Sequence, residues 1–176
     1  HSGHISFLRQ DIPIISSIGT AFIAKAIQDS SRSDFEKEVC YLIPRVESEG
    51  LLQSGYYKSY PAKQRSFSLC DRELSAKGAE FWHSIPASRQ IVSCPCNRIE
   101  TIGSLLVKSF PVDHSIFGAS AYGVQTSEGW VVYTGDLRLH GKRGATTKAF
   151  AEAAKALSPL VLICEGTHVD SEKATD

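Results

Sequence analysis

Three side chains capable of chemistry each follow a short run of apolar residues. They are His114, Asp136 and Glu165, after residues 105–112, 130–134 and 160–164 respectively. Imidazole and carboxylate groups bind metals and transfer protons, and one carboxylate can bridge two cations in a dinuclear hydrolase. Taken singly, each has a plainer interpretation: a hydrogen-bonded loop histidine, an aspartate turn after Gly135, and a helix-capping glutamate.

The loop after Asp136 carries further polar candidates. His140 lies four residues after Asp136, where it either orients that carboxylate, contacts a substrate or is an ordinary surface histidine. Arg138, Lys142 and Arg143 form a small basic cluster. Such a cluster suits a phosphate-bearing substrate, but a solvated charged face is the commoner outcome.

The elements that must position these groups alternate between strands and helices. Apolar runs and alternation predict strands at 11–15, 105–112, 119–126, 130–134 and 160–164. Helical periodicity predicts helices at 21–29 (with Thr20 as N-cap), 35–42, 71–82 and 146–157. Residues 50–67 predict an irregular or hairpin segment. This is an α/β pattern, and open α/β sheets place ligands beyond their strand ends, so we expect His114, Asp136 and Glu165 to converge.

Composition excludes some classes of protein. Lys and Arg total 19, as do Asp and Glu, so the zero net charge disfavours strong, indiscriminate nucleic-acid binding. Neither a membrane span nor a signal peptide is expected. Five cysteines, an odd number, favour reduced thiols and a cytoplasmic location, with a metal or redox role for Cys94-Pro-Cys96 as the weaker alternative. Because the sequence lacks Met and starts at His1, we expect a fragment.

Several of these segments together resemble one superfamily. His1-Ser-Gly-His4, Asp113-His114-Ser115 and Tyr133-Thr-Gly-Asp136 are similar, in this order, to the second, third and fourth motifs of the metallo-β-lactamase superfamily. A closer resemblance is to its β-CASP branch, the ribonuclease J-like and RNA 3′-end-processing nucleases. It is carried by residues 112–115, 118–121, 132–138 and 164–167, within matching regions at 1–29 and 98–170.

This resemblance implies a fold and a site. The fold would be a metallo-β-lactamase-type αββα sandwich, incomplete in this chain. His1, His114 and Asp136 would be metal ligands, whereas His4 is expected to point away. Asp136 and Glu165 would be catalytic, and Arg138 and His140 are weaker candidates for substrate binding. Two zinc ions in the intact protein would generate a hydroxide that attacks a phosphodiester of RNA, or less favourably of DNA.

The resemblance also implies a domain organisation. Residues 1–170 would form a partial metallo-β-lactamase domain, with an insertion or elaboration at about 30–97, and 171–176 would begin a missing β-CASP or linker segment. The family's paired His-x-His would precede His1, and its later histidines would follow Asp176. The fragment would therefore be inactive alone, and the intact protein, an exonuclease or an endonuclease, could form a homodimer.

Two other functions remain open. One is a metallo-β-lactamase-fold hydrolase of a small ester, thioester or lactone, which the zero net charge slightly favours. The other is a metal-free subunit that serves as a binding or scaffold protein. The Glu165-Gly-Thr segment favours the nuclease over the small-ester hydrolase more strongly than the charge favours the reverse.

Overall fold

The computed structural model describes residues 2–31, 35–55, 59–86, 91–92 and 96–166. His1 therefore lies outside the described residues, as do Cys94 and the segment from 167 onward. The chain divides into two compact units, residues 1–99 and 100–176. Both mix helices with strands, so the predicted α/β class is confirmed.

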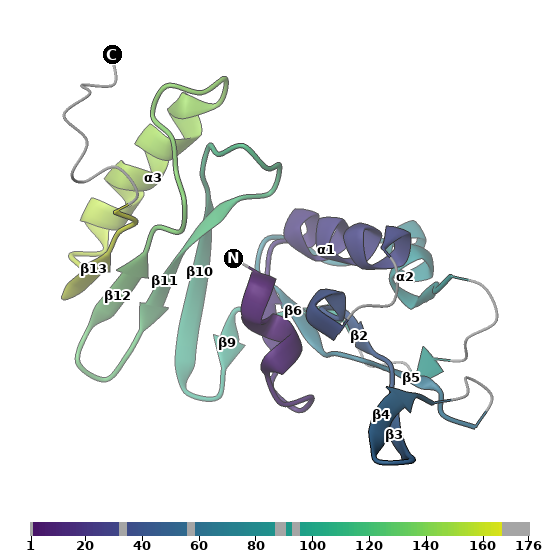
Figure 1. Ribbon diagram of the computed structural model, residues 1–176. Coiled ribbons are helices and arrows are strands. Elements are labelled where there is room, and N and C mark those ends of the chain that lie inside the picture. Colours follow the sequence, from purple (N-terminus) through teal and green to yellow (C-terminus); the bar gives the residue numbers. More distant parts are fainter. Residues whose placement is uncertain (1, 32–34, 56–58, 87–90, 93–95, 167–176) are drawn as a thin grey trace. The chain divides into compact units, whose positions relative to one another are not determined.

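The first unit is built on short strands and two longer helices (Figure 1). A sheet of order β1-β6-β8 is wholly parallel, and two further sheets have the orders β2-β5-β7 and β3-β4. The elements in chain order are η1 (Ser2–Phe7), β1 (Ile14–Ser16), α1 (Ile18–Ser30), η2 (Phe35–Lys37), β2 (Tyr41–Leu42), β3 (Arg45–Ser48), β4 (Leu51–Ser54), β5 (Ala62–Gln64), β6 (Phe67–Leu69), α2 (Ala76–His83), β7 (Ile91–Val92) and β8 (Cys96–Arg98).

The core of this unit lies between α1, α2 and the parallel sheet. Ala21, Phe67, Leu69 and Trp82 are among its buried residues, and the rings of Phe67 and Trp82 meet edge to face at 4.8 Å. Strand β6 lies between β1 and β8 in this sheet. Part of the 30–97 stretch therefore belongs to the same sheet as β1.

Two sequence predictions in this unit are wrong in detail. Helix α1 begins at Ile18, and its N-cap is Ser17 rather than Thr20, because the Ser17 hydroxyl accepts the Thr20 N–H at 3.2 Å. Residues 35–42 form only the turn η2 and strand β2. The Gln28 carboxamide oxygen accepts the N–H groups of Cys40 and Tyr41, which holds this backbone extended.

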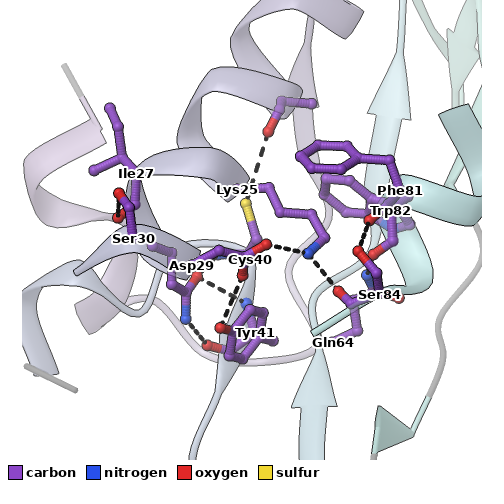
Figure 2. Close-up of polar contacts among 12 residues, drawn as sticks. Lys25, Ile27, Asp29, Ser30, Cys40, Tyr41, Gln64, Phe81, Trp82 and Ser84 are labelled. Carbon is purple, nitrogen blue, oxygen red and sulfur yellow. Dashed lines mark hydrogen bonds and ion pairs between the residues drawn. The ribbon is translucent and has the colours of Figure 1, made fainter. Parts of the chain in front are cut away.

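A buried lysine connects α1 to the segment after α2. Lys25 is fully buried, and its ammonium group binds the Asp29 carboxylate at 2.7 Å and the Ser84 carbonyl (Figure 2). The rings of Phe81 and Tyr41 face the same nitrogen, with centroids at 5.0 and 5.7 Å. The charge is thus paired and surrounded by aromatic faces, as a buried cation requires.

In residues 100–166, the described part of the second unit, one helix accompanies a single sheet (Figure 1). Its elements are β9 (Thr101–Ile102), β10 (Leu105–Pro111), β11 (Ser120–Gln125), β12 (Trp130–Tyr133), α3 (Gly144–Ala156) and β13 (Val161–Ile163). The sheet order is β13-β12-β11-β10-β9. Helix α3 packs on one face, where Phe150 and Ala154 meet Val112, Ala121 and Val132.

Strand directions in this sheet decide where the candidate residues lie. Strand β11 is antiparallel to both β10 and β12, and β12 is parallel to β13. Strands β10, β12 and β13 therefore run the same way, and their carboxyl ends share one edge of the sheet. His114, Asp136 and Glu165 follow these three ends, which confirms the predicted convergence at the level of topology.

Candidate metal and catalytic site

The site is centred on a histidine–aspartate pair. His114 Nε2 lies 3.6 Å from Asp136 Oδ2, and the two side chains are 26% and 28% exposed. The Ser115 hydroxyl is 3.1 Å from the same Nε2, whereas His114 Nδ1 is buried without a hydrogen-bond partner among the described residues. Two side chains of metal-ligand type are therefore close together and partly shielded from water, and one buried ring nitrogen has no hydrogen-bond partner among the described residues.

Glycine shapes the turn that presents Asp136. Gly135 has a φ of 59°, in the left-handed region, and a Cβ at this position would lie 3.2 Å from the Ser120 carbonyl oxygen. A side chain at 135 would therefore be strained and crowded. Next to it, the N–H of Thr134 donates to the Ile163 carbonyl at 3.0 Å, which extends the pairing of β12 and β13 up to the turn.

Glu165 acts on this turn through the backbone. Its Oε1 accepts the N–H of Leu137 at 3.1 Å, one residue beyond Asp136. The contact joins the end of β13 to the segment that carries Asp136. Glu165 is thus placed to position Asp136, and its predicted catalytic role remains a prediction.

Asp113, just after the end of β10, holds the loop that follows Asp136. Sequence reasoning missed this role. This residue is buried, and its carboxylate Oδ2 accepts the N–H of Arg143 at 3.2 Å. Its carbonyl accepts the N–H of Arg138 at 2.7 Å, and its own N–H donates to Thr147 Oγ1 at 2.8 Å. Three hydrogen bonds from the residue before His114 therefore fix the loop after Asp136 and the start of α3 to the strand end.

Gly141 is required by this arrangement. A Cβ on residue 141 would overlap the Asp113 carboxylate. Gly141→Ala is therefore expected to displace that carboxylate and lower the free energy of unfolding by about 2 kcal/mol, as overpacking of a closed site does. Urea denaturation followed by circular dichroism measures it.

Gly166→Ala is the matched control, because nothing lies within 4 Å of a Cβ at that glycine. It should change the free energy by less than about 0.5 kcal/mol. A loss that small for Gly141→Ala would show that Asp113 does not hold the loop in this way.

The remaining candidates lie on exposed or undescribed parts of the chain. Arg138 and His140 are exposed on the loop that Asp113 holds. His4 is exposed on η1, in the first unit, and its predicted orientation away from the site stays a prediction. His1 lies outside the described residues, so its role as a ligand stays a prediction.

Within the described residues, no group of three or more His, Cys, Asp or Glu side chains is placed to hold a metal ion. Burial raises the pKa of the Cys96 thiol to about 11. Cys94 lies outside the described residues, so the alternative of a metal or redox pair with Cys96 stays a prediction. None of the described helices is both long and apolar enough to cross a membrane.

Comparison with known proteins leaves the family open. No protein-family model matches the chain, and no curated protein matches it. The chain is similar to a solved structure described as a protein of unknown function from Enterococcus faecalis V583, with 31% sequence identity and a TM-score of 0.39. The match covers 57% of this chain and 24% of that one, so the region compared spans about a quarter of the neighbour's length.

Proposed function

We propose that this chain is part of a zinc-dependent phosphodiesterase, a nuclease of the β-CASP branch of the metallo-β-lactamase superfamily that acts on RNA in preference to DNA. The observation that carries the proposal is the His114–Asp136 pair, with 3.6 Å between imidazole nitrogen and carboxylate oxygen, at an edge where three strand ends meet. The expected αββα sandwich and cytoplasmic location belong to the same proposal.

The side chains of His114 and Asp136 are of types that bind zinc. Imidazole nitrogen and carboxylate oxygen are zinc ligands, and the unsatisfied Nδ1 of His114 shows that the ring is not engaged in a complete hydrogen-bond network of its own. His114 and Asp136 would hold the metal, and Glu165 would keep the Asp136 turn in place through Leu137. When bound, zinc supplies a hydroxide near neutral pH and offsets charge on the phosphoryl group.

The chain's own residues have separable tasks in this reaction. The exposed Arg138, Lys142 and Arg143 would attract the phosphodiester backbone, since guanidinium and ammonium groups bind phosphate oxygens. Asp113 fixes the loop that carries these cations relative to His114. Binding of the phosphodiester backbone and orientation of His114 would thus both depend on the hydrogen bonds of Asp113.

The test is metal analysis and hydrolysis with the full-length protein. We expect purified protein to contain zinc, to cleave end-labelled single-stranded RNA faster than DNA of the same sequence, and to lose cleavage after chelation and regain it when zinc is restored. Cleavage of a thioester or lactone but not of RNA would support the small-ester alternative instead. Full-length protein without zinc and without hydrolysis would support the scaffold alternative.

A further inference from the structure

We propose that Phe117 and Arg143 form a platform on which one unpaired base of the RNA substrate stacks beside the His114–Asp136 pair. This inference rests on the proposed function and names how that site would recognise single-stranded substrate. It concerns the loop between β10 and β11, together with the N-terminus of α3, all within the second unit.

Phe117 presents its ring to solvent on the loop that follows His114. It is 72% exposed, and it lies three residues after His114 on the short loop that leads into β11. The next residue, Gly118, has a φ of 87°, and its carbonyl accepts the Ser120 hydroxyl at 3.2 Å. The turn at Gly118 thus ends the loop directly after the ring and gives Phe117 a defined place at its tip.

Arg143 lies over the same ring. Its guanidinium carbon is 5.6 Å from the Phe117 ring centroid, within the range of a cation–π contact. Its backbone N–H is held by the buried Asp113 carboxylate at 3.2 Å. The residue before His114 therefore holds the backbone of Arg143, whose guanidinium group pairs with the aromatic ring, and this links the platform to the strand end that carries His114.

The chemistry of this pair favours a nucleobase as occupant. Bases stack on aromatic rings and on guanidinium planes, and such stacking is tolerant of base identity. Arg138 and Lys142 are exposed on the same loop as Arg143 and would contact the phosphates on either side of the base. A base inside a duplex has both faces covered by its neighbours, so the platform selects a single strand.

The experiment measures binding by full-length protein in which Asp136→Asn slows cleavage. Fluorescence anisotropy compares a labelled single-stranded RNA with an abasic strand of the same length. We expect Phe117→Leu, which keeps the apolar side chain but removes the ring, to weaken binding of RNA about tenfold and binding of the abasic strand less than twofold. Phe117→Trp should retain the affinity for RNA.

Three results would overturn the platform. These are an unchanged affinity of Phe117→Leu for RNA, an equal loss for the abasic strand, and a melting temperature lowered by several degrees, which would show that the ring packs inside the full-length protein or against another protein surface. Zinc-dependent cleavage by the wild type distinguishes failure of the platform from failure of the proposed function. If the wild type cleaves RNA and any of these three results is found, the platform alone fails. If the wild type neither binds nor cleaves RNA, both fail.

Discussion

Full-length protein with Asp136→Asn is expected to cleave RNA at least about a hundredfold more slowly than the wild type. The substitution keeps the size of the side chain but removes the charge of a carboxylate that lies 3.6 Å from His114 Nε2. A metal ion that offsets charge in the transition state contributes several kcal/mol, which is lost when a ligand that holds the metal is removed, and each 1.4 kcal/mol corresponds to a factor of ten in rate. Initial rates on end-labelled RNA measure the loss, and mass spectrometry of the metal content measures the zinc retained.

Asp11→Asn is the matched control for this change. Asp11 is exposed and pairs with Arg9 at 2.6 Å on the surface, so the same chemical substitution removes only a solvent-screened ion pair. Its activity and zinc content should equal those of the wild type. His114→Ala should reproduce the loss seen with Asp136→Asn. Unchanged activity in Asp136→Asn would exclude every enzyme function that assigns the metal to this residue.

The convergence of strand ends was predictable because it depends on local patterns. Apolar runs marked the strands that end before His114, Asp136 and Glu165, and one general rule about α/β sheets placed ligands beyond such ends. The β12-α3-β13 unit then set the strand ends before Asp136 and Glu165 side by side, since a crossover helix lets two neighbouring parallel strands end at the same edge. The His114–Asp136 contact depends instead on β10 and β12, which run the same way on either side of β11.

What sequence reasoning missed depends on residues far apart in the chain. The role of Asp113 requires Gly141 and Arg143, about thirty positions later, and no local pattern links them. The extended backbone at Cys40 and Tyr41 depends on Gln28, whose carboxamide outweighs the local helical periodicity. The N-cap of α1 was missed for a smaller reason: Ser17 and Thr20 are both good caps, and only the position of the first turn distinguishes them.

The buried lysine of α1 leads to the largest expected effect on stability. Lys25→Ala removes a fully buried ammonium group and its apolar stem, and leaves a cavity beside Phe81 and Tyr41. It also deprives the Asp29 carboxylate of its cation, although the Tyr41 hydroxyl still donates to that carboxylate at 2.9 Å. Breaking a buried pair costs about 3–5 kcal/mol, and we expect about 3 because Asp29 keeps 20% exposure to water.

Urea denaturation of Lys25→Ala should therefore show a midpoint well below that of the wild type. Lys77→Ala, on the exposed side of α2, removes the same side chain and should cost less than about 0.5 kcal/mol. Lys25→Met refills the cavity without the charge, so it should lower the free energy of unfolding by less than Lys25→Ala does. Adding Asp29→Asn to Lys25→Met should recover part of that free energy, because no buried charge then lacks a partner. If Lys25→Ala is as stable as Lys77→Ala, then the buried ammonium group and its bonds to the Asp29 carboxylate and the Ser84 carbonyl do not stabilise this unit.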